Sequence, residues 1–283
     1  MHPYVVVDVF TDTPLEGNQL AVFTDGRALS TEQMQRTARE LNLSETVFVL
    51  PAEADGDVRI RIFTPASELP FAGHPVLGTA FAVGELVETL AEAKAVRLET
   101  GVGVVSIELD RSGSRIVFGR MEQPIPDWAP YERADELLQA LGVERSGLPV
   151  EVYRNGPRHV YVGLASEDAV AALKPNLGVL AELPAMGVSC FAGAGRRWKT
   201  RMFAPAMGVP EDPATGSAAG PLAVHLGRHG RVGFGEDIEI RQGAEIGRPS
   251  VLYARADGSS ERIERVVVGG SAVLVARGEY RLA

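Results

Sequence analysis

The chain has 283 residues, of which 45% are hydrophobic and 23% are charged, and its formal net charge is −9 at pH 7. This length suits two domains of ordinary size, and the composition is that of a soluble globular protein. An acidic chain without a cluster of Lys and Arg is not expected to bind nucleic acid, because phosphate backbones require a basic surface. No apolar run is long enough to cross a bilayer and the first residues lack a signal-peptide pattern, so we expect a cytoplasmic protein.

The first half of the chain is predicted to contain two helices among several strands. Alternating apolar and polar residues predict strands at 4–10, 20–23, 46–50, 57–63, 95–99, 103–109 and 115–118. Ser30 and Gln33 form a capping-box pattern, which predicts a helix that ends near Asn42. A second helix is predicted at 74–87. It is small or apolar nearly all round, so it has to be enclosed by protein.

The second half is predicted to have the same character. We expect a helix at 135–141, helical segments between 166 and 183, and strands at 150–154, at 159–164, around Cys190 and between 237 and 282. The stretch 212–227 predicts a second enclosed helix. The Pro-rich stretch 123–130 is expected to resist regular structure and to link domains 1–122 and 131–283, with the last strand free to return to the N-terminal domain.

Cys190 is the only cysteine of the chain. An intrachain disulfide is therefore impossible, and a metal cage built from cysteines is excluded. Because Cys190 lies in the apolar segment 188–191, we expect it to pack in a core strand.

One passage occurs twice, 140 residues apart: the segment Arg61–Ala66 is matched by Arg201–Ala206. A repeat of half the chain length predicts two similar domains, and such domains usually enclose a site between them.

Each copy of the repeat then enters a helix. Pro75 and Pro213 suit the first helical position, which places His74 and Asp212 at or near the cap. One interpretation is that Asp212 only caps its helix, a contribution of about 1 kcal/mol. The other is that two helix N termini direct N–H groups and partial positive charge toward a carboxylate.

These motifs resemble the PhzF-like isomerases of phenazine biosynthesis, which have the diaminopimelate-epimerase-like fold. The resemblance covers essentially the whole chain and rests on Val7–Phe10, Gly17-Asn18, Leu43–Thr46, Phe71–Pro75, Glu211–Ser217, Gln242-Gly243 and Gly247–Ser250. It implies an α+β protein of two pseudo-symmetric domains, each a β-barrel-like sheet wrapped around a central helix. It also implies an active site in the cleft between them, a small carboxylate-bearing cyclic substrate, no cofactor and a homodimer.

The resemblance further implies that Glu45, His74, Asp212 and Ser217 carry the chemistry, with Gly73 nearby. In this hypothesis Glu45 is the acid/base that moves a proton, and partial burial is expected to raise its pKa. His74 and Asp212 hold or protonate polar groups of the substrate, while Ser217 and Gly73 help to bind its carboxylate or a neighbouring oxygen. The remaining candidates for substrate binding are Thr215, Gly216 and Asn18.

Related epimerases on this fold use two cysteines, one at each helix entrance. Here the corresponding residues are Ala72 and Thr215, and neither can remove a proton from carbon. The 140-residue offset places Ala185 opposite Glu45, so the base is not duplicated. A single base predicts a proton shift on one face of the substrate, which is an isomerisation.

Two other functions stay open. An amino- or hydroxy-acid epimerase or racemase would release a stereoisomer, and a non-catalytic protein would bind a small carboxylate without proton exchange. His225 and His229 have the i, i+4 spacing of metal ligands, but no third ligand is identifiable nearby, so we expect no metal. Nucleotide-binding motifs are also missing.

Overall fold

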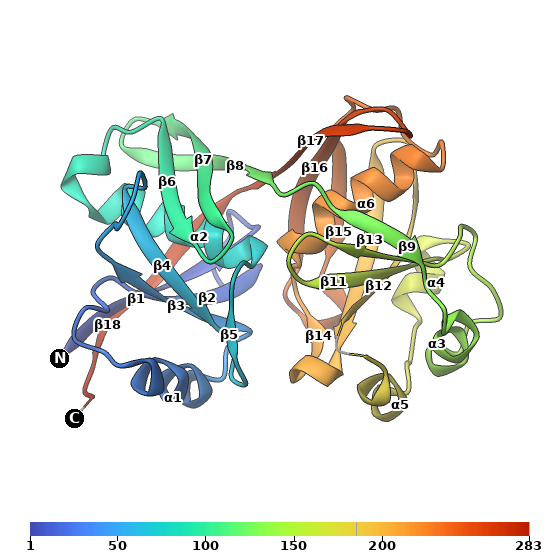
Figure 1. Ribbon diagram of the computed structural model, residues 1–283, viewed down its shortest axis with the longest axis horizontal. Helices are drawn as coiled ribbons and strands as arrows, with labels where there is room; N and C mark the ends of the chain where they lie inside the picture. Colours follow the sequence, from blue (N-terminus) through green and yellow to red (C-terminus); the bar gives the residue numbers. More distant parts are fainter. Residues whose placement is uncertain (185, 283) are drawn as a thin grey trace. The chain divides into compact units, whose positions relative to one another are not determined.

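The computed structural model describes residues 1–184 and 186–282 (Figure 1). Ala185, the expected counterpart of Glu45, lies outside the described residues. The chain forms two compact units, one made of Met1–Glu122 with the segment that begins at Gly269, the other of Gln123–Val268. The expected division at 1–122 and 131–283 stays a prediction. In the described part no helix is both long and apolar enough to cross a membrane.

The first unit is a mixed sheet with a buried helix. Its helices are α1 (Thr31–Leu41), α2 (Gly73–Leu86) and the short 3-10 turn η1 (Glu88–Leu90). Its strands are β1 (His2–Val9), β2 (Asn18–Phe23), β3 (Glu45–Leu50), β4 (Val58–Phe63), β5 (Glu68–Leu69), β6 (Ala95–Thr100), β7 (Gly103–Ser112), β8 (Arg115–Gln123) and β18 (Ala272–Tyr280). Strand β18 pairs with β1, which joins the C-terminal strand to this unit.

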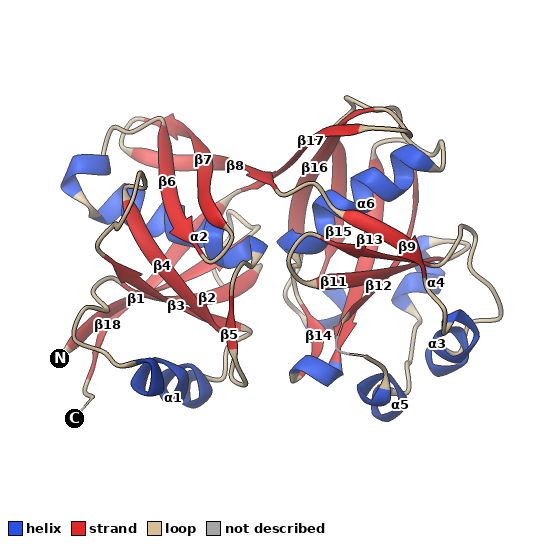
Figure 2. Cartoon of the chain, viewed as in Figure 1, coloured by secondary structure: helices blue, strands red, loops and turns tan. Residues whose placement is uncertain are grey.

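The second unit has the same plan. Its helices are α3 (Ala134–Leu141), α4 (Glu167–Ala171), α5 (Leu177–Glu182) and α6 (Gly216–Arg228), with 3-10 turns η2 (Pro205–Met207) and η3 (Ala244–Ile246). Its strands are β9 (Asp127–Pro130), β10 (Glu151–Arg154), β11 (Arg158–Gly163), β12 (Gly187–Ala194), β13 (Arg197–Ala204), β14 (Val209–Asp212), β15 (Ile238–Gln242), β16 (Ser250–Gly258) and β17 (Ile263–Gly270). Strands dominate both units (Figure 2).

The pairing of the strands shows that the two units are copies of one design. From β1 to β7 the successive pairs β1–β2, β2–β3, β3–β4, β4–β6 and β6–β7 are antiparallel, parallel, antiparallel, parallel and antiparallel. The pairs β10–β11, β11–β12, β12–β13, β13–β15 and β15–β16 follow the same alternation. The sequence repeat is therefore a repeat of the fold, as predicted.

Helices α2 and α6 occupy equivalent places in the chain, and both are enclosed. Helix α2 comes between the parallel pair β4 and β6, and helix α6 comes between the parallel pair β13 and β15. Every residue from Gly73 to Gly84 and from Gly216 to Leu226 is buried. Gly78 permits close packing in the first unit, since a Cβ there would lie 2.6 Å from Val9 and 2.8 Å from Leu20. The expectation of two enclosed helices is confirmed.

Two predicted boundaries are wrong. Residues 127–130 are not irregular: β9 pairs antiparallel with β10, and Pro130 is tolerated because it ends its strand. Helix α6 begins at Gly216 and not at Asp212, which is the last residue of β14. The helix at Ser30 is as predicted, with the capping box to Gln33 and a left-handed C-cap at Asn42.

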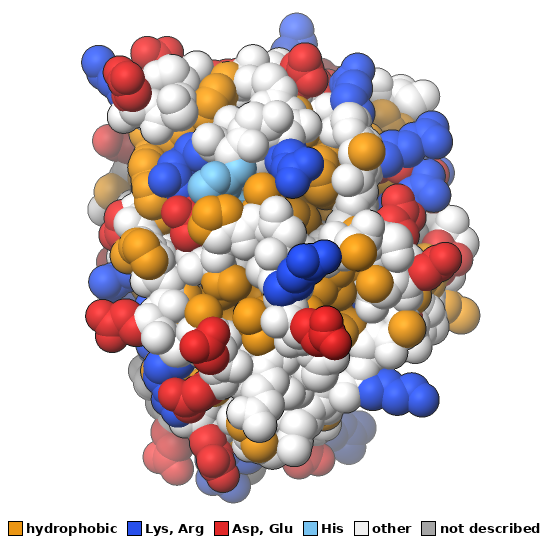
Figure 3. All heavy atoms as spheres, turned by 90° about the vertical axis from the view of Figure 1, so that its right-hand side faces the viewer, with side chains coloured by type: hydrophobic (Ala, Val, Ile, Leu, Met, Phe, Trp, Pro, Cys, Tyr) orange, Lys and Arg blue, Asp and Glu red, His pale blue; other side chains and the backbone are white. Residues whose placement is uncertain are grey.

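The surface carries charges of both signs. Figure 3 shows acidic and basic side chains interspersed on one face of the molecule, with apolar atoms between them. Cys190, in contrast, is fully buried, and burial raises the pKa of its thiol to about 12. The thiol is therefore a core group, as expected.

The repeated passage forms an equivalent hairpin in each unit. In the first, Arg61 of β4 makes a two-pronged ion pair with Glu68 of β5, and its guanidinium lies 5.2 Å from the Phe63 ring. In the second, Arg201 of β13 pairs in the same way with Glu211 of β14 and lies 5.0 Å from Phe203. The repeated arginine thus fixes the hairpin that precedes each helix.

The two ion pairs differ in burial, so removing each one tests how much the repeated arginine stabilises its hairpin. The Arg201 and Glu211 side chains are 9% and 12% exposed, whereas Glu68 is 39% exposed. We expect Glu211→Gln to lower the free energy of unfolding by about 3 kcal/mol, because it leaves a buried guanidinium without its counter-charge. Glu68→Gln is expected to cost at most about 1 kcal/mol. Urea unfolding of both variants checks this, and equal losses would contradict it.

Candidate active site

In the first unit, two of the predicted catalytic residues lie together. Glu45 is the first residue of β3, His74 is the second of α2, and the distance between His74 Nε2 and Glu45 Oε2 is 3.5 Å. The Glu45 side chain is 16% exposed and the His74 side chain is buried. Asn18, at the start of β2, places its Nδ2 atom 3.3 Å from His74 Nδ1. Three sequence-predicted residues therefore form one cluster.

The imidazole of His74 is neutral near pH 7. Burial lowers its pKa to about 3, although a hydrogen bond with the backbone of Gln19 acts in the opposite direction. A neutral ring has either a hydrogen or a lone pair at Nε2, and both can share a proton with a carboxyl group. The ring therefore lies beside the Glu45 carboxyl without adding a permanent charge.

The entrance of α2 leaves its first turn without a side-chain cap. Ala72 is the N-cap and makes no capping hydrogen bond, and Gly73 is the first helical residue. Backbone N–H groups at such an end carry partial positive charge. This arrangement suits an anionic group of a ligand.

In the second unit, Asp212 lies before the helix and does not have the cap position expected for it. The N-cap of α6 is Thr215, whose hydroxyl donates a hydrogen bond of 2.6 Å to Asp212 Oδ2. Gln242 Nε2 donates to the Asp212 carbonyl at 2.7 Å and to Thr215 Oγ1 at 3.0 Å. Together these bonds hold the turn between β14 and α6, and Asp212 stays buried within it.

The first turn of α6 is held by three buried side chains, each donating to one carbonyl. Gln123 bonds Gly216 O at 2.9 Å, Asn155 bonds Ser217 O at 3.0 Å and Tyr161 bonds Ala218 O at 2.7 Å. Buried hydrogen bonds to three successive carbonyls rigidify this turn. Ser217, Thr215 and Gly216 are therefore fixed in position.

Several of these supporting residues were not anticipated from the sequence. Gln242 lies in one of the motifs that carry the family resemblance, but the resemblance implies no role for it. No sequence pattern marks His159, whose Nε2 lies 3.1 Å from Ser217 Oγ. These partners are 27 to 58 residues from the groups they hold. Only a family pattern at Gln242 could have suggested one of them.

The two histidines at the end of α6 do have a third neighbour, so the expectation that no further ligand is nearby is wrong. Glu151 Oε2 lies 3.1 Å from His225 Nδ1 and 3.1 Å from His229 Nε2. The same oxygen accepts from Arg228 Nη1 at 2.8 Å and from the Tyr153 hydroxyl at 2.9 Å. The guanidinium already supplies a cation to this carboxylate, and a metal would have to displace it.

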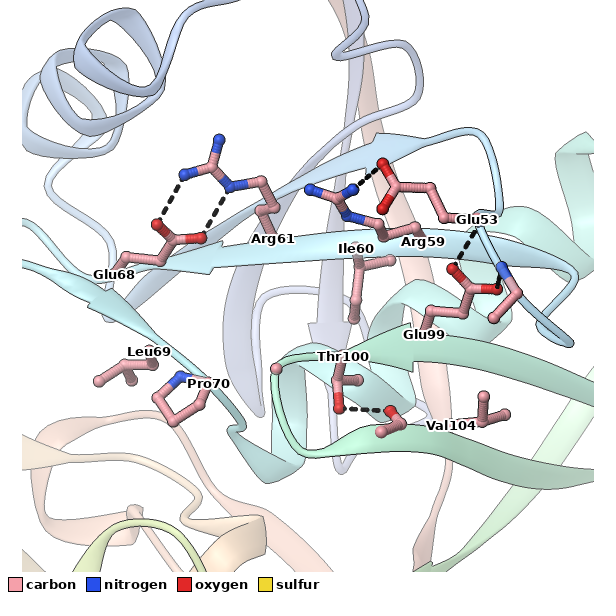
Figure 4. A pocket seen from close by; sticks show the side chains of 13 residues that line it. Glu53, Arg59, Ile60, Arg61, Glu68, Leu69, Pro70, Glu99, Thr100 and Val104 are labelled. Atoms are coloured by element: carbon pink, nitrogen blue, oxygen red, sulfur yellow. Dashed lines mark hydrogen bonds and ion pairs between the residues drawn. The ribbon is translucent and has the colours of Figure 1, made fainter.

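A pocket of about 600 Å³ in the first unit is separate from these residues (Figure 4). Its charged groups bind one another: Arg59 pairs with Glu53, Arg61 pairs with Glu68, and Glu99 accepts backbone N–H groups at 2.7 to 3.0 Å. None of the predicted site residues lines it. We therefore place the candidate site at Glu45 and His74 and not in this pocket.

Comparison with known proteins decides the family. The family model described as phenazine biosynthesis-like protein matches residues 7–278. The chain belongs to this family. It is 56% identical over 282 residues to a trans-2,3-dihydro-3-hydroxyanthranilate isomerase of Pseudomonas aeruginosa, covering 100% of both chains. Relatives named as isomerases at this level of identity show that the chain is itself an isomerase that acts on a small molecule.

Solved structures of the family confirm the predicted fold. A PhzF-family protein of Bacillus anthracis, 26% identical, superposes with a TM-score of 0.85 and covers 99% of each chain. A predicted epimerase of Pseudomonas aeruginosa, 31% identical, superposes with a TM-score of 0.81 over 100% of each chain. The α+β fold expected from the resemblance, with a sheet around a central helix in each unit, is thus the fold of the phenazine biosynthesis-like family.

Proposed function

We propose that this family member isomerises trans-2,3-dihydro-3-hydroxyanthranilate, the compound named for its 56%-identical relative, by moving one proton through Glu45. The observation that supports the mechanism is the largely buried Glu45 carboxyl at 3.5 Å from the neutral ring of His74. One carboxyl takes a proton from carbon and returns it to another carbon on the same face. The neutral ring of His74 lies beside this carboxyl and adds no permanent charge to its surroundings.

The remaining candidates bind the substrate in this proposal. His74 and Asp212 hold its polar groups, and Asn18 orients His74. Gly73, Gly216 and Ser217 bind its carboxylate, and Thr215 supports this binding by donating its hydroxyl hydrogen to Asp212. Uncapped helical N–H groups and hydroxyl donors together suit an anion. The active form is proposed to be a cytoplasmic homodimer that needs no cofactor.

The test is turnover of trans-2,3-dihydro-3-hydroxyanthranilate by the purified protein in D₂O, followed by NMR. We expect a product with a shifted double bond that carries solvent deuterium at the new C–H position, or retains the original hydrogen if the proton does not leave Glu45. An unchanged substrate would overturn the choice of substrate. A stereoisomer as product would favour the epimerase alternative. The similarity to a predicted epimerase supports testing for that product.

A further inference from the structure

We infer that His159 is a positioning residue that makes Ser217 a hydrogen-bond donor toward the substrate's carboxylate. His159 lies on β11 and is 1% exposed, and its Nε2 is 3.1 Å from Ser217 Oγ. The inference rests on the proposed function, because it assumes that Ser217 binds substrate. It adds the group that sets the direction of the Ser217 hydroxyl proton.

Among the described residues, the ring of His159 has a polar neighbour, Ser217, at one nitrogen and no hydrogen-bond partner at the other. His159 Nδ1 has no hydrogen-bond partner among the described residues. It faces Gly187, its partner in the β11–β12 register, where a Cβ would lie only 2.7 Å from Nδ1. The missing side chain at Gly187 therefore provides the space that the ring occupies.

The charge of the ring follows from the burial. Desolvation lowers the pKa of His159 to about 4, so the imidazole is neutral near pH 7 and has a hydrogen on only one nitrogen. A hydrogen on Nδ1 would be a buried donor without an acceptor, which is the rarer case in folded proteins. A hydrogen on Nε2 is instead donated to Ser217 Oγ.

This bond determines what Ser217 can do. An oxygen that accepts from His159 keeps its own O–H free to donate elsewhere. Asn155 Nδ2 donates a hydrogen bond of 3.0 Å to the Ser217 carbonyl, and this bond holds the Ser217 backbone in place. Ser217 also lies in the first turn of α6, where backbone N–H groups carry partial positive charge. The hydroxyl and the helix end thus act on an anion together.

A Ser–His contact could also be read as a nucleophile and its base, but the surroundings argue against it. A general base works best when its pKa lies near the working pH, and it is normally oriented by a third group on its other nitrogen. The pKa of His159 is well below that range, and its Nδ1 has no such group in the described part of the chain. We therefore assign positioning and not nucleophilic catalysis.

The ring tautomer is tested first, because it does not depend on the substrate. Long-range ¹H–¹⁵N NMR spectra of the ¹⁵N-histidine protein at pH 7 are expected to show His159 as the Nε2–H tautomer, assigned by its loss in His159→Gln. Ser217→Ala is expected to shift the Nε2 resonance. An Nδ1–H tautomer, or a Nε2 resonance unaffected by Ser217→Ala, would overturn the inference.

Binding then separates this inference from the proposed function. Anthranilate, an aromatic carboxylate that cannot undergo the isomerisation, serves as the probe in calorimetry. Ser217→Ala and His159→Asn are each expected to weaken binding about tenfold, whereas His159→Gln keeps an N–H near the Nε2 position and is expected to stay within about twofold. In turnover, His159→Asn should raise KM and leave kcat within about twofold.

The double variant shows whether His159 acts through Ser217. In the Ser217→Ala background, His159→Asn is expected to add less than about twofold, because the group it positions is gone. An undiminished effect in that background would overturn the inference, as would a loss in Ser217→Ala with none in His159→Asn. If Ser217→Ala itself binds anthranilate normally, the failure lies in the proposed substrate contact of Ser217, and the NMR result still decides the tautomer. Thermal unfolding of each variant identifies any loss caused by misfolding.

Discussion

Glu45→Gln is expected to lower kcat for the proposed isomerisation by about 10²- to 10⁴-fold, the size of a general acid/base contribution. The amide has the shape of the carboxyl group but cannot accept and return a proton near neutral pH. Because the imidazole of His74 is neutral and 3.5 Å away, losing the charge at position 45 leaves no unpaired cation beside it. Folding and substrate binding should therefore survive the change.

The measurements are the rate of product formation and the exchange of solvent deuterium into the substrate. Calorimetry should first show that Glu45→Gln binds anthranilate about as tightly as the unchanged protein. Glu32→Gln is the matched control, since it is the same substitution in the same unit, on the surface of α1, where the Glu32 side chain is 82% exposed. It should leave kcat within about twofold. Full activity in Glu45→Gln would remove Glu45 from the mechanism.

Glu151→Gln is expected to lower the free energy of unfolding of the protein by about 3 to 5 kcal/mol, the usual cost of removing one partner of a buried ion pair. Four side chains meet the same Glu151 oxygen at 2.8 to 3.1 Å, and one of them is the guanidinium of Arg228. Arg228 also lies 4.2 Å from the ring of Trp128. Without the carboxylate, that cation stays largely buried with no counter-charge.

The measurement is urea unfolding at pH 7, with Glu136→Gln as the control. Glu136 makes a comparable two-pronged pair with Arg133 on the surface, so its loss should cost at most about 1 kcal/mol. A loss below about 1 kcal/mol for Glu151→Gln would show that the carboxylate is not what holds this cluster together.

The same cluster predicts sensitivity to acid. Hydrogen bonds from His225, His229 and Tyr153, with the charge of Arg228, lower the pKa of Glu151 well below its usual range despite the opposing effect of burial. Its contribution to stability is complete above the unfolded pKa of about 4.5 and is lost as the pH falls toward the folded value. Burial lowers the pKa of His225, so the unfolded chain takes up that proton first, below about pH 6.5. Both effects destabilise the fold on acidification. Glu151→Gln should remove the part below about pH 4.5 but should not lessen the part due to His225, because Glu151 raises the pKa of that ring.

The candidate site was predictable from the sequence to the extent that it follows local patterns. The helix entrances at His74 and near Asp212 were visible because Gly, Pro and small residues recur there in both halves, although the start of α6 was placed four residues too early. The family resemblance implied that Glu45 and His74 carry the chemistry, and the contact between them came from the structure. Their roles, and those of the other site residues, stay predictions.

The sequence by itself determined that the chain folds as two copies of one design around two enclosed helices. That information is local and periodic: a strand alternates polar and apolar residues, and a buried helix is apolar on all sides. Only the tertiary structure decided which polar groups meet in the interior. Glu151 reaches His225 across 74 residues and His159 reaches Ser217 across 58. Such pairs produce no periodic pattern in the sequence, because the number of residues between the two partners depends on how the whole chain packs and not on any one segment.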